Sequence, residues 1–390
     1  MIEEKKVEHI ELFYDLIFVF CISKLTAMLE PMTEHFDDFS LLPVYLMLFV
    51  ILLQIWIMTT FLMNRYGYRH ATDYLCIFIN MFFLFFMADG IREDWSADSF
   101  LRFHVAWALI MLNMALQFGY KLHRHECMDD LDDRIIKRYM TILLTEGALA
   151  AICVPVFLYT GIALTIVPIL AGAALTAASA RLFGKRPVHF DHLAERISLL
   201  VVVTFGEMVV GIAGYFTIEA EPYYGMMVFL VVFGLFLIYV FDYYNYLDRE
   251  TRTSGIGFTL LNIPLIFGAN NITMALEAML TSEAATLPKT LYLVISMFVY
   301  MAGFWGLAVY HKPEFQFKNA KKPWLGYSII GVFVAGCALM LALHDQPAVS
   351  AALTVAMVFG ILLLIWRFFK ANAKEQRVAA FCEWRPPVQD

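Results

Sequence analysis

The sequence predicts an all-α fold, a bundle of about twelve helices that cross a lipid bilayer. Of the 390 residues, 61% are hydrophobic and only 16% are charged, and the mean hydropathy is +0.68. A soluble globular domain is roughly 45–50% apolar and about 25% charged. The apolar residues form runs that are long enough to span a bilayer, and the lysines and arginines gather in every second loop. This composition excludes disordered, fibrous, nucleic-acid-binding and ordinary cytosolic proteins.

Twelve apolar runs are candidate transmembrane helices, because a helix needs about 20 residues to cross the hydrocarbon core. The first and the seventh runs are the most polar. Barrel strands would instead alternate strictly over about 10 residues, and that alternation is absent from the sequence. The predicted spans are residues 11–29, 41–63, 70–88, 100–120, 139–159, 162–182, 193–216, 223–243, 255–280, 291–310, 324–343 and 348–368.

Loop charge supports this count of spans. With the N-terminus placed in the cytoplasm, the cytoplasmic segments hold most of the 28 lysines and arginines, Lys121 among them. The outer loops hold only Arg92 and Lys289. Because basic loops stay in the cytoplasm, both termini are expected there. The longest loop, residues 121–138, mixes both signs of charge, which favours a short surface helix.

The chain also contains signs of an internal repeat. The first span reads ELFYDLIFVFCIS and the seventh reads ERISLLVVVTFGE, and both begin with a glutamate, Glu11 and Glu195. The sixth span contains ALTIV and the twelfth contains ALTVA. Repeats that are offset by six spans share one orientation in the membrane. We therefore predict a parallel 6+6 repeat, with a first six-helix half over residues 1–190 and a second half, ending in a polar cytoplasmic tail, over residues 191–390.

Ionisable side chains inside the predicted spans are the candidate functional residues. A charge at membrane depth costs about 2.5–3.5 kcal/mol on insertion scales, so it needs a partner or a cavity. Glu11 and Asp15 are four residues apart and share a helix face near the cytoplasmic end. Lys24 and Glu207 lie about 20 and 18 Å beyond Glu11 and Glu195 at 1.5 Å per residue. We predict that Lys24 and Glu207 pair between the halves; the alternative is that such pairs only hold helices together.

Other polar residues in the predicted spans carry weaker signals. Asp73 and Glu146 are expected nearer to helix ends, which favours helix capping or snorkelling to the interface. Pro264 lies between Asn262 and the later Glu277 in the ninth span, and this pattern indicates a discontinuous helix. Hydrogen bonding between helices remains the simpler explanation for the asparagines.

No cofactor, metal site or catalytic site is predicted. His189 and His192 have a spacing that a metal can use, but no third ligand is evident. The six cysteines form no CxxC pair. No nucleotide-binding or hydrolase motif stands in a supporting context.

Two segments resemble the signature helices of the bacterial low-temperature-requirement protein A (LtrA) family. HIELFYDLIFVFCISKLT begins at His9 and HLAERISLLVVVTFGEMVVGIA begins at His192; the family patterns are ELFFDLVFVFAITQL and HxxERxGLxxIIxLGE. LLNIPLIFGANNITMALEAML is similar to a third family segment. The chain departs from the family at Lys24, Asn262 and Met208, where Gln, His and Ser are usual. The resemblance implies a bacterial membrane protein whose family-typical residues are Glu11, Asp15, His192, Glu195, Arg196, Gly206, Glu207 and Glu277.

Together these observations predict a multi-pass protein of the bacterial inner membrane, most simply a gradient-driven secondary transporter or ion pathway. Its expected partners are membrane lipids and a small solute or ion that the sequence does not identify, and not nucleic acid. Two alternatives stay open, as does the oligomeric state: an intramembrane lipid-modifying enzyme, with Glu and His as acid and base, and a non-catalytic scaffold or sensor involved in growth in the cold. The expected substrate or ion pathway is Glu11, Asp15, Lys24, His192, Glu195, Arg196, Glu207, Asn262 and Glu277.

Overall fold

The computed structural model describes residues 7–36, 39–67, 70–92, 96–124, 129–216, 222–281 and 285–373. Within this part of the chain, twelve helices are long and apolar enough to cross a membrane. The predicted all-α class and the number of spans are therefore confirmed. The helices are α1 (His9–Ala27), α2 (Glu30–His35), α3 (Leu41–Tyr66), α4 (Ala71–Asp89), α5 (Ala97–Arg124), α6 (Asp130–Thr160), α7 (Ile166–Phe183), α8 (Phe190–Gly211), α9 (Pro222–Phe241), α10 (Ile256–Thr281), α11 (Thr286–Leu307), α12 (Pro323–Ala342) and α13 (Pro347–Asn372).

The predicted surface helix between the fourth and fifth spans is wrong. α5 continues to Arg124, and α6 begins at Asp130 and runs on without a break into the membrane-spanning part. The side chain of Asp129 caps α6 by accepting hydrogen bonds from the backbone N–H groups of Leu131 and Asp132. Acidic side chains are favourable in the first turn of a helix. The acidic residues here therefore begin a transmembrane helix and do not belong to a separate surface helix.

The predicted break in the ninth span is also wrong. Pro264 lies inside α10, which is continuous, and Pro155 lies in the same way inside α6. A proline removes one backbone donor. In a helix bundle, neighbouring groups and small changes of the local backbone satisfy the carbonyl oxygen that has lost this donor.

The chain forms two compact units. Unit 1 comprises Met1–Thr204 and Glu250–Thr259, and unit 2 comprises Phe205–Arg249 and Leu260–Asp390. α8 and α10 each begin in unit 1 and continue into unit 2. The 6+6 repeat and the predicted halves, residues 1–190 and 191–390, stay predictions.

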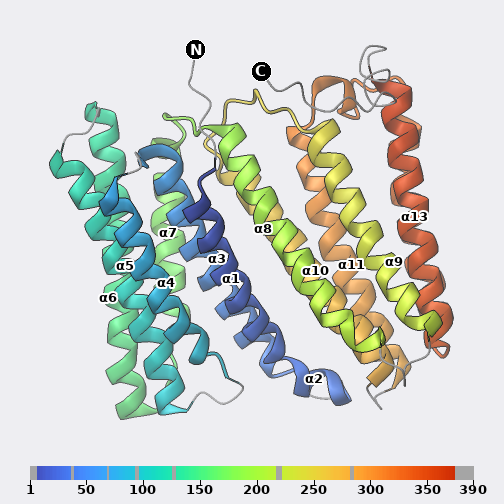
Figure 1. The fold of residues 1–390 in the computed structure, drawn as a ribbon, viewed down its shortest axis with the longest axis horizontal. Helices are drawn as coiled ribbons and strands as arrows, with labels where there is room; N and C mark the ends of the chain where they lie inside the picture. Colours follow the sequence, from blue (N-terminus) through green and yellow to red (C-terminus); the bar gives the residue numbers. More distant parts are fainter. Residues whose placement is uncertain are drawn as a thin grey trace. The chain divides into compact units, whose positions relative to one another are not determined.

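In unit 1, α5 packs against α4 and α6, α6 packs against α7, and α1 packs against α3 and α4. α1 and α8 both begin at the end of the unit where α3 ends (Figure 1). This arrangement places the first turns of α1 and α8 level with the last turns of α3.

A buried ion pair joins α4 to α5 in unit 1. Lys121 Nζ lies 2.7 Å from Asp73 Oδ2, and Gln117 Nε2 donates to Asp73 Oδ1 over 3.0 Å. All three side chains are buried. Asp73 lies in the first turn of α4, near a helix end as expected, but its carboxylate is buried against Lys121 and does not snorkel. Lys121 is not in a loop as predicted, because α5 extends past the end predicted from hydropathy.

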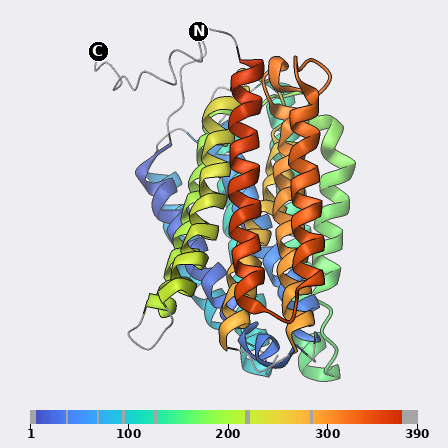
Figure 2. The same cartoon turned by 90° about the vertical axis from the view of Figure 1, so that its right-hand side faces the viewer.

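In unit 2, α13 packs against α9 and α12, and Figure 2 shows it between them. A π-helical turn, η2 (Asp242–Tyr246), follows α9 directly. Asp242 Oδ1 lies 2.8 Å from His311 Nε2, and Tyr246 donates to the backbone oxygen of Ile365 over 2.7 Å. These contacts tie the end of α9 to α13 and to the segment after α11.

The placement of both termini in the cytoplasm, which stays a prediction, is testable with reporter fusions. Alkaline phosphatase fused after Arg92 is expected to be active, because that loop lies outside and the enzyme needs an oxidising compartment. Green fluorescent protein fused after Arg186 is expected to fluoresce. The opposite pattern at both sites would invert the orientation.

Candidate functional site

The start of α1 holds two buried carboxylates. The backbone N–H of Glu8, the N-cap residue, donates to Glu11 Oε2 over 3.0 Å as part of a capping box. Such a box satisfies amides that a helix otherwise leaves unpaired at its start. Asp15 follows one turn later, on the same face of the helix. Both side chains are only 1% exposed.

α8 supplies the cation that joins these two carboxylates. Arg196 is fully buried, with Nη1 2.8 Å from Glu11 Oε1 and Nη2 3.3 Å from Asp15 Oδ1. Its guanidinium carbon lies 6.0 Å from the ring centroid of Tyr14 and 5.7 Å from that of Trp56. Arginine suits such a position, because its planar group donates to two carboxylates and also stacks on aromatic rings.

α3 contributes polar contacts that the sequence analysis missed. Trp56 Nε1 donates to Asp15 Oδ1 over 2.7 Å, and the hydroxyl groups of Tyr14 and Thr59 lie 3.0 Å apart. Trp56 stands in a long apolar run, where a tryptophan is expected to pack as a hydrophobic side chain. The signal that would have found it is general: a buried indole N–H needs an acceptor.

Asn64, near the end of α3, holds the start of α8 and determines which ring nitrogen of His192 carries the hydrogen. Its Oδ1 accepts from the backbone N–H of His189, and its Nδ2 donates to the backbone oxygen of the same residue, each over 3.0 Å. The amide is thereby oriented with Nδ2 3.0 Å from His192 Nδ1. Since an amide N–H needs an acceptor, His192 Nδ1 carries no hydrogen. His192 Nε2 then donates to Glu11 Oε2 over 3.2 Å.

The segment before α8 is held by two arginines. Arg186 donates to Asp132 on α6, and these hydrogen bonds raise the pKa of Arg186 above its ordinary value. Arg65, on α3, donates to the backbone oxygens of Arg186 and Ser254 over 3.1 and 3.4 Å. Both contacts lie within unit 1, and they bring the first turns of α8 to α3.

We call Glu11, Asp15, His192 and Arg196 the α1–α8 cluster. Two carboxylates share one guanidinium group, and no other arginine or lysine of the described residues forms an ion pair with either of them. Asp15 Oδ2 and Arg196 Nε are buried and have no hydrogen-bond partner among the described residues. An unbalanced buried charge is costly. The arrangement is therefore suited to take up a proton or another monovalent cation at Asp15 Oδ2.

Two predicted site residues of unit 1 lie outside this cluster. Glu195 is half-buried beside Arg196 and makes no hydrogen bond or ion pair within the described residues. Lys24 is exposed in the last turn of α1. It lines a cavity of about 490 Å³ together with Asp89 and Arg92.

The remaining predicted site residues belong to unit 2. Glu207 is half-buried on α8, while on α10 Asn262 is buried and Glu277 is half-buried. Lys24 belongs to the other unit, so its pairing with Glu207 stays a prediction. The structure thus joins four of the nine predicted residues directly.

A further buried carboxyl group lies in the middle of α6. Glu146 is fully buried, and Gln54 Nε2 donates to its Oε2 over 2.5 Å. Its Oε1 has no hydrogen-bond partner within the described residues, and no cation pairs with it there. The expectation of capping or snorkelling is wrong, because α6 begins at Asp130 and Glu146 is its seventeenth residue. Burying a carboxylate that has no cation beside it is costly.

These features define the class of the protein: a multi-pass, all-α membrane protein with ionisable side chains buried between its helices. Residues 6–359 match the model of the family described as bacterial low temperature requirement A protein (LtrA). The chain belongs to this family. It is also similar to an uncharacterized protein of Rhizobium meliloti (strain 1021), with 27% identity over 255 residues. That match covers 62% of the chain and 59% of the relative.

Removing the cation of the cluster is expected to destabilise the fold. Arg196→Gln leaves two buried carboxylates without a partner, at a cost of about 3–5 kcal/mol. Arg102→Gln is the matched control, because Arg102 pairs with Asp89 and Asp98 at the exposed surface, where such pairs contribute about 1 kcal/mol or less. Thermal denaturation of the purified proteins in detergent gives the midpoint of each variant. Equal midpoints would show that Arg196 does not hold the helices together.

Gly172 on α7 packs directly against Glu146, and we expect that this position has no room for a larger residue. A Cβ atom added at Gly172 on α7 meets Glu146 Oε2 and lies 2.8 Å from Gln54 Nε2. Gly172→Ala should therefore lower the thermal midpoint. Gly331→Ala, at a helical glycine where an added Cβ meets nothing within 4 Å, should leave it unchanged or raise it slightly. A stable Gly172→Ala protein would contradict the packing of α3, α6 and α7.

Proposed function

We propose that the protein is a gradient-driven secondary transporter or ion pathway in which Asp15 binds and releases a proton. One observation carries the proposal: Asp15 Oδ2 is buried without a hydrogen-bond partner among the described residues, in a cluster where two carboxylates share one guanidinium group. Buried ionisable groups of transmembrane helices are a general mark of ion and proton pathways. We place the protein in the bacterial inner membrane with both termini in the cytoplasm, as the distribution of basic loops indicates.

The other hydrogen bonds of the cluster favour Asp15 over its neighbours as the proton site. Both carboxylate oxygens of Glu11 accept hydrogen bonds, from Arg196 on one side and from His192 and Glu8 on the other. A proton at His192 Nδ1 would stand against the amide donor of Asn64. Within the α1–α8 cluster, as far as its described contacts go, only Asp15 offers an oxygen that can accept a proton without losing a contact.

The pathway beyond the cluster follows the residues predicted from the sequence. We propose that Lys24, Glu195, Glu207, Asn262 and Glu277 line it. The role proposed for Asp15 does not depend on them, because it rests on contacts within unit 1.

The Asp15→Asn variant is expected to fold and to lose proton movement. The amide removes the unbalanced charge and keeps an acceptor for Trp56 and Arg196, so the thermal midpoint should not fall. Proteoliposomes with an entrapped pH-sensitive dye, energised by a valinomycin-induced potassium potential, should acidify with the natural protein. The variant should show the rate of protein-free vesicles. The infrared band of a protonated carboxyl group that titrates in the natural protein should also be missing from the variant.

Asp98→Asn is the matched control for this experiment, because Asp98 is exposed and pairs with Arg102. Vesicles with Asp98→Asn should acidify at the rate of vesicles with the natural protein. If Asp15→Asn and the natural protein acidify the vesicles equally, Asp15 is not the proton site. Lipid turnover by the purified protein without proton movement would favour an intramembrane enzyme instead. Normal growth in the cold of cells in which Asp15→Asn replaces the natural protein would favour a scaffold.

A further inference from the structure

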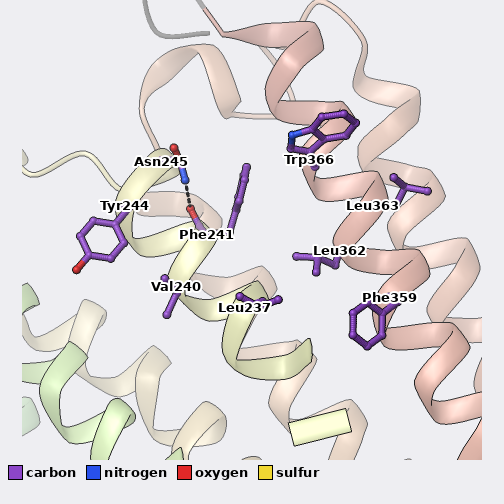
Figure 3. Close-up of a pocket in the computed structure, with 9 residues that line it drawn as sticks. All are labelled: Leu237, Val240, Phe241, Tyr244, Asn245, Phe359, Leu362, Leu363 and Trp366. Atoms are coloured by element: carbon purple, nitrogen blue, oxygen red, sulfur yellow. Dashed lines mark hydrogen bonds between the residues drawn. The ribbon is translucent and has the colours of Figure 1, made fainter. Parts of the chain in front are cut away.

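An apolar groove opens on the side of unit 2, between the end of α9 and α13 (Figure 3). Its volume is about 720 Å³. One wall carries Leu237, Val240 and Tyr244, and the other carries Phe359, Leu363 and Trp366. Tyr244 and Leu363 are exposed, at 68% and 48%, so the groove faces whatever surrounds the helices. None of the residues that line it is acidic.

Two lysines lie beside lining residues at one end of this groove, Lys370 in the last turn of α13 and Lys312 on the segment that follows α11. Lys370 Nζ lies 4.0 Å from the ring centroid of Trp366. Lys312 Nζ donates to the backbone oxygen of Asn245 over 3.0 Å. Figure 3 shows Trp366 and Asn245 together at one end and Leu237 and Phe359 at the other. The groove is therefore apolar along its length and positively charged at its end.

This distribution of charge and apolar surface matches one component of the surrounding bilayer. An acyl chain fits an apolar groove between transmembrane helices, and basic side chains at the membrane surface attract anionic headgroups. Tyr and Trp beside the lysines are typical of the level of the headgroups. A zwitterionic lipid offers the same chains but no net charge for the lysines.

We propose that the groove binds one anionic phospholipid, with an acyl chain against Leu237 and Leu363 and its phosphate group at Lys370 and Lys312. The π-helical turn η2 shapes the wall at the charged end. There the Asn245 side chain donates to the backbone oxygen of Phe241 over 2.9 Å. That amide is engaged within its own helix, which leaves the headgroup to the two lysines. The site lies within unit 2 and is independent of the α1–α8 cluster.

Native mass spectrometry of the purified protein in detergent tests this site. Phosphatidylglycerol and phosphatidylcholine with identical acyl chains are added in equal amounts, and the retained copies of each are counted. The natural protein is expected to retain one phosphatidylglycerol in preference. Lys370→Gln should lower that retention about fivefold, because one lysine near a headgroup contributes about 1 kcal/mol. Lys185→Gln, an exposed lysine in unit 1, should change nothing.

A second variant separates the groove from general surface charge. Leu363→Trp fills the groove and should lower the retention of both lipids, whereas Leu339→Trp, at an exposed position on α12 outside the groove, should not. Equal retention of the two lipids by the natural protein would overturn the proposal. So would equal effects of Lys370→Gln and Lys185→Gln. A dimer mass that Leu363→Trp abolishes would make the groove an interface between two copies and would likewise overturn it.

Discussion

Unit 1 depends on the burial of one guanidinium group. Arg196 is fully buried, so its charge has to be met by carboxylates and aromatic rings. The buried charge is compensated by Glu11 and Asp15 on α1 and by Trp56 on α3. Arg196 in turn holds each of these side chains in place. Removing one partner of a buried ion pair costs more than the pair itself contributes. Because of this asymmetry, Arg196 constrains how the first turns of α8 lie against α1 and α3, together with the contacts of Asn64.

The same cluster has properties that a purely structural ion pair would lack. Two carboxylates share one cation, and the amide of Asn64 holds His192 with its hydrogen on Nε2. A cluster with balanced charges would be indifferent to a further cation, and the proton that we propose at Asp15 depends on this difference. Glu146 shows a different solution to burial, with a single amide partner and no cation. In unit 2 the described residues form a smaller buried contact, between Asp242 and His311, and two lysines lie at the end of the apolar groove.

Much of the fold and part of the site were predictable from the sequence. Glu11 with Asp15 and His192 with Arg196 are each four residues apart, so their shared helix faces follow from helix geometry alone. Trp56 and Asn64 were missed, because they lie on α3, a long and mostly apolar helix on which neither stands out. Lys121 was misplaced, because hydropathy ends the predicted span one residue before it while the helix continues to Arg124. Glu146 was misjudged for the same reason at the start of α6.

The sequence by itself determined the all-α class and the twelve spans, because hydropathy and helix length are local properties that add up along a segment of about 20 residues. The tertiary structure alone decided which carboxylates meet which cation. Glu11 and His192 are 181 residues apart, and no local pattern encodes the rotation of one helix against another. Packing sets that rotation, and with it which oxygen atom of Asp15 has no hydrogen-bond partner among the described residues.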